Sequence, residues 1–133
     1  MKKNNILIII SILFLILTII YSNNRYIKNK KNTYQNAYYS IANIDEYVVE
    51  TRTRYYIYSY IFNKIKYYGQ TKSNGKLDKG IKKLVMFNKN RISESFLFEN
   101  TIIPDEYLNK DTIWTTPPNF IDPEDLKFLD DYK

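Results

Sequence analysis

The chain begins with a run of apolar residues that predicts a membrane-spanning helix. From Ile6 to Tyr21 the sequence reads ILIIISILFLILTIIY, in which one serine and one threonine are the only interruptions. At about 1.5 Å per residue this run covers roughly 24 Å of a hydrocarbon core about 30 Å thick, so flanking residues complete the span. We therefore divide this part of the chain into a basic leader at residues 1–5, a transmembrane anchor in the lipid bilayer at residues 6–22 and a polar, basic linker at residues 23–35.

Two other interpretations of the apolar run stay open. A cleaved signal peptide shares the basic leader, but Ile20, Tyr21 and Ser22 place a bulky residue where cleavage needs a small one. A helix buried in a protein core fits poorly, because the apolar positions run all round the helix. We expect a retained signal-anchor.

The charges that flank the anchor give opposing indications of its orientation. Lys2 and Lys3 precede the span, whereas four cations follow it, at Arg25, Lys28, Lys30 and Lys31. This count is nearly balanced and if anything favours a cytoplasmic carboxy-terminal domain. The very short basic leader resembles a secretory signal-anchor instead, so we expect a single-pass membrane protein with an extracytoplasmic domain. The four cations can also contact anionic lipid headgroups, although a solvated spacer is the simpler interpretation.

Alternating side chains predict a β-hairpin from Thr51 to Gly69, around which the rest of the domain is organised. β-branched and aromatic residues dominate this stretch, and Asn63-Lys64 offers a two-residue turn. In that register Phe62 lies opposite Ile65, Tyr60 opposite Tyr67 and Tyr58 opposite Gly69. Alternation places one set of side chains on a common face, namely Arg52, Arg54, Tyr56, Tyr58, Tyr60 and Phe62.

Shorter patterns predict the other strands. Residues 36–50 alternate as a strand that is broken at Asp45-Glu46, with a helix over residues 33–44 as the main alternative. A polar loop with an Asn74-Gly75 turn covers residues 71–80. A strand at 81–87, a turn at 88–94 and a short strand at 95–99 follow.

Beyond Asn100 the pattern predicts an extended segment that wraps over the sheet. It is rich in proline and carries Trp114 and Phe120 as expected contacts with the core. Asp122-Pro123 marks the start of a short helix over residues 124–132, with the aspartate as N-cap. The fold class is therefore mainly β. A transmembrane helix precedes a small antiparallel β-domain at residues 36–133, with four or five strands that form a barrel or one twisted sheet.

The composition limits the catalytic and metal-binding chemistry that the chain can perform. The 133 residues include no cysteine and no histidine, which excludes disulfides and thiolate sites and removes the commonest general base and metal ligand. We expect no catalytic residues, no metal and no cofactor. The abundance of tyrosine, with 14 residues, is most simply the bias of an AT-rich genome.

The net charge of +6 is unevenly distributed. Residues 1–33 carry six cations and no acid, residues 51–91 carry a net +10 and residues 92–133 a net −7. We expect the acidic end of the chain to fold back over the basic strands or both to face solvent. A basic sheet face offered to an acidic partner is the sharper alternative.

These features favour a non-catalytic, membrane-anchored binding or structural module at the cell envelope. Its partner would be an envelope protein, a glycan or the bilayer surface, and the candidate surface contacts are Arg52, Arg54, Tyr56, Tyr58, Tyr60 and Tyr68. The same arginines and tyrosines resemble a stacking platform for nucleic acid, an unlikely partner beside a membrane segment. A carboxylate-based hydrolase or cation site is the third hypothesis, with Asp105, Glu106, Asp111, Asp122, Glu124 and Asp125 as its candidates.

Three segments carry a resemblance to a known group of proteins, namely YYIYSYIFNKIKYYG (55–69), KKLVMFNKNRISESFLF (82–98) and IPDEYLN with WTTPPNF (103–120). Their order resembles that of small single-anchor membrane proteins of unknown function, common in Bacteroidota. The chain departs from that pattern at Lys89 or Arg91, where proline is usual. The resemblance implies a compact β-domain beside a membrane and brings no reaction or catalytic residue with it.

Overall fold

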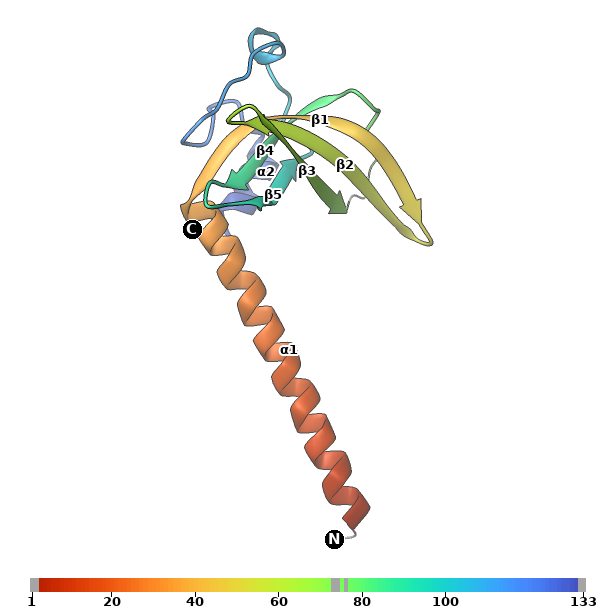
Figure 1. The fold of residues 1–133 in the computed structure, drawn as a ribbon. Coiled ribbons are helices and arrows are strands. Elements are labelled where there is room, and N and C mark those ends of the chain that lie inside the picture. Colours follow the sequence, from red (N-terminus) through yellow and green to blue (C-terminus); the bar gives the residue numbers. More distant parts are fainter. Residues whose placement is uncertain (1–2, 73–74, 76, 132–133) are drawn as a thin grey trace.

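A single long helix carries the domain at one end. The computed structural model describes residues 3–72, 75 and 77–131, and α1 runs from Lys3 to Gln35 without interruption (Figure 1). It is the one helix in the described part of the chain that is long and apolar enough to cross a membrane, and none of its apolar window is buried. The interpretation as a buried core helix is therefore wrong. The linker at residues 23–35 is helical and continuous with the anchor.

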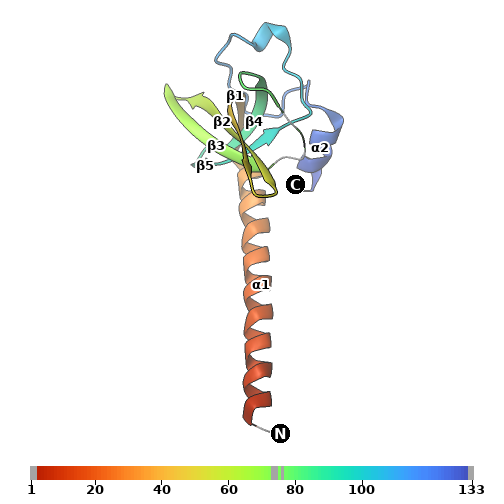
Figure 2. The same ribbon diagram turned by 90° about the vertical axis from the view of Figure 1, so that its right-hand side faces the viewer.

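Five antiparallel strands form one strongly curved sheet in the order β3-β2-β1-β4-β5, and Figure 2 shows its curvature from the side. Their bounds are β1 Ala37–Glu50, β2 Thr53–Phe62, β3 Ile65–Lys72, β4 Lys82–Asn88 and β5 Arg91–Phe98. The sheet curls until β5 lies beside β3, so that it nearly closes into a barrel. The predicted mainly β fold is confirmed.

The central hairpin has the predicted register. Phe62 pairs with Ile65, Tyr60 with Tyr67 and Tyr58 with Gly69. Asn63 and Lys64 have φ values of 51° and 64° and form the turn. Two consecutive left-handed residues match the twist of the flanking strands, which is why this turn fixes the register. One difference is that Thr51 and Arg52 form the turn between β1 and β2, so that β2 begins at Thr53.

β1 is long enough to belong to two parts of the sheet. Residues 37–43 pair with β4 and residues 42–50 pair with β2, with a register shift between Ile44 and Glu46. The break expected at Asp45-Glu46 is therefore a bulge, which bends the strand without ending it. The alternative of a helix over residues 33–44 is wrong beyond Gln35, where α1 ends.

The second hairpin and the carboxy-terminal helix differ from expectation in their bounds. The turn between β4 and β5 is only Lys89-Asn90, because β5 begins at Arg91 rather than at residue 95. The predicted terminal helix is α2, Pro123–Asp130, preceded by a 3-10 turn η1 at Asp105–Tyr107. The Asp122 carboxylate accepts a hydrogen bond from the Glu124 N–H at 2.8 Å, which confirms the N-cap. Of the remaining predictions, Asn74 in its turn and Tyr132 lie outside the described residues.

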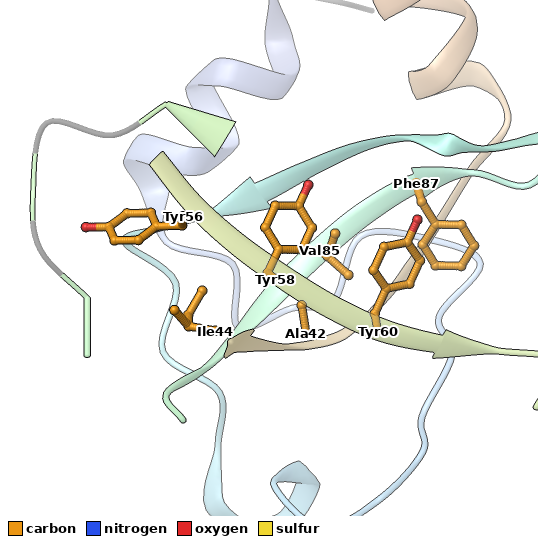
Figure 3. Close-up of a cluster of buried hydrophobic side chains, with 7 residues drawn as sticks. All are labelled: Ala42, Ile44, Tyr56, Tyr58, Tyr60, Val85 and Phe87. Carbon is orange, nitrogen blue, oxygen red and sulfur yellow. The ribbon is translucent and has the colours of Figure 1, made fainter. Parts of the chain in front are cut away.

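The inner face of the curled sheet forms one core, in which tyrosines make hydrogen bonds as well as apolar contacts. Tyr56, Tyr58 and Tyr60 project side by side from β2 into the interior, against Val85 and Phe87 of β4 (Figure 3). Each of the three hydroxyls has a partner on another segment. The Tyr56 hydroxyl accepts from the Leu77 N–H at 2.7 Å, the Tyr58 hydroxyl bonds Ser95 Oγ at 2.8 Å, and the Tyr60 hydroxyl donates to the Ile92 carbonyl at 2.5 Å. Two of these bonds connect β2 to β5 across the gap in the barrel.

The outer face of β1 and β4 forms a second core beneath the carboxy-terminal tail. Trp114 pairs with Tyr39 through two backbone hydrogen bonds of 2.8 and 2.9 Å, so the tail adds a short bridge to the sheet. Trp114, Phe120 and Tyr107 pack together with ring centroids 5.3–5.6 Å apart. α2 adds Leu129, which is fully buried. The wrapping tail and its two expected contact residues are confirmed.

Candidate binding surface

The structure places half of the predicted contact residues inside the domain. Tyr56 and Tyr58 are 0% exposed and Tyr60 is 2% exposed, so their assignment as surface contacts is wrong. Alternation separated the two faces of β2 correctly, but the curling of the sheet turns the tyrosine face inward. A nucleic-acid stacking platform on these rings is excluded for the same reason, because bases could not reach them.

The other three predicted contact residues are exposed, at two separate places. Arg52 and Arg54 lie at the projecting end of the β1–β2 hairpin. Tyr68 is 62% exposed on the outer face of β3, where the Lys66 ammonium lies 5.2 Å from the centre of its ring. The arginines and Tyr68 thus do not form one surface.

The outer face of the β2–β3 hairpin is the part of the sheet that the tail leaves open. Its outward positions alternate along β2 as Ile57, Ser59 and Ile61, of which Ile61 is 46% exposed and Ser59 is buried. On β3, Lys66 pairs with Ile61 and Tyr68 pairs with Ser59. This face could have been found in the sequence, because the alternation that buries one set of side chains exposes the other.

A cleft of about 480 Å³ lies where this face meets the tail. β1 contributes Ile41, Asn43 and Asp45 to its lining, the hairpin contributes Ser59, Ile61 and Lys66, and residues 108–111 of the tail form its opposite wall. The Lys82 ammonium donates a hydrogen bond to the Leu108 carbonyl and so holds this wall in place. Sequence reasoning missed the cleft, since it joins β1 and the hairpin to tail residues that lie more than forty positions further along the chain.

Asp45 is the most unusual polar group in this cleft. It follows Ile44 at the bulge of β1, where the change of register redirects its side chain. Its Oδ1 accepts a hydrogen bond from Asn43 Nδ2 at 2.9 Å, whereas its Oδ2 is buried and has no hydrogen-bond partner among the described residues. A buried carboxylate oxygen without a donor is costly, and it offers an acceptor to any ligand that enters.

The surroundings of Asp45 keep its carboxyl charged at neutral pH. Burial raises its pKa, but the nearby Ser59 hydroxyl, the Asn43 amide and the ammonium groups of Lys66 and Lys79 outweigh that effect, so the net pKa lies below its usual value. The Ser59 hydroxyl favours the charged form of this carboxyl. The cleft therefore contains a carboxylate beside cationic and amide donors.

The acidic tail does fold back over basic strands, but carbonyl oxygens make the contacts. The Lys83 ammonium donates to the Thr101 carbonyl at 3.2 Å, and burial lowers the pKa of this lysine despite the nearby Asp125 and Glu99 carboxylates. Asp125 instead accepts bonds from the Thr101 N–H at 2.8 Å and the Thr101 hydroxyl at 2.6 Å. In this contact the tail binds the strand lysine through a carbonyl oxygen, while the Asp125 carboxylate bonds the tail itself.

Two of the carboxylates considered for catalysis or cation binding have structural roles. Asp122 caps α2 and Asp125 holds the tail, so both have structural partners. Within residues 3–72, 75 and 77–131, no group of three or more histidine, cysteine, aspartate or glutamate side chains is arranged to hold a metal ion.

The fold and this surface define a β-barrel domain that follows one potential membrane-spanning helix, with an open cleft on the outer face of its first three strands. No family model matches the chain, no curated protein matches it in sequence, and no solved structure matches its fold.

Proposed function

We propose that the chain is a single-pass, membrane-anchored and non-catalytic binding module that presents the outer face of β1, β2 and β3 to a ligand in the cell envelope. One observation carries the proposal. The tail covers the outer face of β4 and part of β1, but it stops at the edge of the cleft and leaves Tyr68 and Ile61 uncovered. A partly apolar surface beside a polar cleft is typical of a ligand site.

The continuity of α1 supports a retained anchor over a cleaved signal peptide. Signal cleavage after Ser22 would cut through the middle of the helix, whose last turns contact the domain. Thr33 is 1% exposed, and its hydroxyl donates to Glu94 Oε2 at 2.9 Å. An extracytoplasmic position of the domain is part of the proposal, and the resemblance to small single-anchor membrane proteins is in agreement with it.

The lining of the cleft favours a carbohydrate as the ligand. Asp45 and Asp111 offset two of the three lysines in the lining, Lys66, Lys82 and Lys110, and the Lys82 ammonium is bonded to the Leu108 carbonyl, so the surface is polar without a strong charge of either sign. Carboxylates and amides bind sugar hydroxyls, and the exposed Tyr68 beside the cleft provides an aromatic face for a sugar ring. An extended protein segment would use the same face and is the competing ligand.

The strand order offers an analogy for this location. A five-stranded barrel in the order 3-2-1-4-5, with the fifth strand beside the third, has the connectivity of an OB-type barrel. Barrels of that type bind oligosaccharides or oligonucleotides on the face of their second and third strands. The analogy concerns the fold alone, and the residues of this cleft must supply the specificity.

Photocrosslinking in intact cells tests the proposal. A benzophenone amino acid replaces Tyr68 in the full chain, and the matched control places it at Leu126, which is 41% exposed on α2. We expect a discrete crosslinked product at position 68 that the control lacks and that added envelope oligosaccharide reduces. Equal labelling at both positions would show that this face is not a binding surface, and a protein product that the sugar does not reduce would exclude the carbohydrate.

Protease treatment of intact cells tests the placement. A domain that is digested from the outside is extracytoplasmic, as proposed. A domain that is digested only after the inner membrane is permeabilised is cytoplasmic, which would overturn this part of the proposal.

A further inference from the structure

A second cleft lies between the end of α1 and the β4–β5 turn, and its chemistry differs from that of the first. Its volume is about 350 Å³, and its lining consists of Lys28, Asn29, Lys31, Asn32, Gln35 and Arg91. These are three cations and three amides, without an acidic side chain. Such a set of donors suits a phosphate group, which offers several acceptor oxygens and a negative charge.

The position of this cleft along α1 matches the level of lipid headgroups. Lys28 lies six residues beyond Ser22, the end of the apolar span, which is about 9 Å along the helix axis at 1.5 Å per residue. The headgroup layer is about 5–8 Å thick on each side of the hydrocarbon core. Helical side chains also tilt toward the amino terminus of their helix, which is the direction of the membrane here. Extended lysine side chains at 28 and 31 therefore reach the headgroup layer.

The domain positions Arg91, its cation in this cleft, beside the lysines of α1. The Lys89 N–H donates to the Asn36 carbonyl at 3.0 Å, and Asn90 Nδ2 donates to Asn36 Oδ1 at 3.3 Å. With the Thr33–Glu94 bond, these contacts fix the β4–β5 turn against the end of α1. Arg91 is consequently presented beside the same helix face as Lys28 and Lys31.

Glu94 is the acidic group next to this cleft, and its charge is already engaged. It pairs with Arg91 at 3.2 Å and accepts the Thr33 hydroxyl. The Arg91 side chain is still 61% exposed, and only one of its five N–H donors is directed at Glu94 in that pair. The cleft thus keeps a net positive charge, to which Arg25 adds one turn nearer the membrane.

We propose that this cleft binds the phosphate-bearing headgroup of an anionic phospholipid from the bilayer in which α1 is anchored. The lipid would bridge the helix and the domain, because Lys28 and Lys31 belong to α1 and Arg91 to β5. This binding would fix which side of the domain faces the membrane. It is independent of any ligand at the cleft around Asp45.

Lipid retention measured by native mass spectrometry tests the proposal. The full chain is reconstituted in nanodiscs of equal parts phosphatidylglycerol and phosphatidylcholine, and the ratio of the two lipids that stay bound after release is recorded. We expect a clear preference for phosphatidylglycerol. Each cation near an anionic surface strengthens binding about fivefold, so Lys28→Gln with Lys31→Gln should reduce the preference about 20- to 30-fold.

Arg91→Gln is the variant that distinguishes the cleft from a merely basic helix. We expect it to reduce the preference about fivefold, although it leaves all helix cations in place. The matched control for Arg91→Gln is Lys64→Gln, which removes an exposed lysine on the β2–β3 turn and should leave the preference unchanged. Trp114 fluorescence confirms that each variant is folded.

Three outcomes would overturn the proposal. The first is equal retention of both lipids by the wild-type chain. The second is an Arg91→Gln variant that retains lipid as the wild type does, since the helix alone would then account for binding. The third is displacement of the lipid by millimolar inorganic phosphate, which would indicate a site for the free ion.

Discussion

Gly69 is the position at which one added methyl group should disturb the whole barrel. It lies on β3 directly opposite Tyr58, whose ring crosses over it to reach Ser95 on β5. A Cβ at position 69 would lie 2.5 Å from the Tyr58 hydroxyl and closer still to Cζ and Cε2 of the ring. Tyr58 is fully buried and stacks with Tyr60 at 6.4 Å, so the ring has no free space into which to move.

Three contributions determine how much Gly69→Ala should change the free energy of unfolding. Overpacking of a tight core costs about 1–3 kcal/mol, and loss of the Tyr58–Ser95 hydrogen bond costs about 1 kcal/mol. Replacement of glycine within a strand recovers about 0.5–1 kcal/mol of backbone entropy. We expect Gly69→Ala to lower the free energy of unfolding by about 2–3 kcal/mol, measured by urea denaturation of the detergent-solubilised chain with Trp114 fluorescence as the signal.

A double-mutant cycle shows whether the clash with Tyr58 is the cause. Tyr58→Val removes the ring atoms that the new methyl group would meet. In that background Gly69→Ala should be neutral or stabilising by up to about 1 kcal/mol, so the coupling between the two positions is about 2–4 kcal/mol. The same loss in both backgrounds would refute the argument, because the cost would then lie in the backbone of β3.

Three further predictions concern the tail and the tyrosines. Asp125→Ala should lower the free energy of unfolding by about 2–4 kcal/mol in the same urea assay, since it leaves the N–H and the hydroxyl of the buried Thr101 without their acceptor. Asp122→Ala should cost only about 1 kcal/mol, the usual value of an N-cap, and should reduce the helical circular dichroism signal of α2 slightly. Burial, with Tyr58 and Tyr67 nearby, raises the pKa of Tyr60 to about 12 against the opposing effect of the Ser95 hydroxyl. Unfolded tyrosine ionises near pH 10, so the contribution of Tyr60 to stability should be constant below about pH 10 and should fall as the pH rises from 10 to 12; a curve that stays flat over this interval would contradict the assignment.

The local chemistry of the turns and caps made most of the fold predictable. Asn63-Lys64 determines the register of the central hairpin, and Asp122-Pro123 determines where α2 begins. Both features depend on residues within a few positions of one another, where backbone preferences decide the outcome. The apolar run of α1 is equally local, since the length and composition of a span are properties of the segment itself.

The face of β2 that is buried could not be predicted from alternation alone. β2 has an aromatic face and a mixed face, and in a flat sheet either of them could have been the buried one. The choice depends on the direction in which the sheet curls, which long-range pairing of β1 with both β2 and β4 determines. One signal was present in the predicted register, where Gly69 stands opposite Tyr58. A glycine beneath a large ring indicates a crowded interior, so this pair already distinguished the inner face.

Tyrosine composition and tyrosine placement need separate explanations. Genome bias can supply many tyrosines, but it does not direct the hydroxyls of Tyr56, Tyr58 and Tyr60 to partners on two other segments, the loop at Leu77 and β5. Phenylalanine at these positions would fill the same space and leave the Leu77 N–H and the Ile92 carbonyl without their partners. Among the described residues, the edge strands β3 and β5 are not joined by a ladder of backbone hydrogen bonds. The Tyr58 and Tyr60 hydroxyls therefore provide the cross-links between β2 and β5.

The connection of α1 to the barrel limits what the candidate binding surface can reach. Asn36 is the only residue between α1 and β1, and Asn36 itself is bonded to the β4–β5 turn. The domain therefore stands on the helix at a set height, about 20 Å beyond Ser22 if the rise is 1.5 Å per residue up to Gln35. In Figure 1 the β2–β3 turn lies on the side of the domain away from the amino terminus of α1. Under the proposed placement, a surface held there would meet envelope components above the headgroups, and the basic cleft at Lys28 would meet the headgroups themselves. This separation is the reason to assign the bilayer contact to α1 and Arg91 and the ligand to the hairpin.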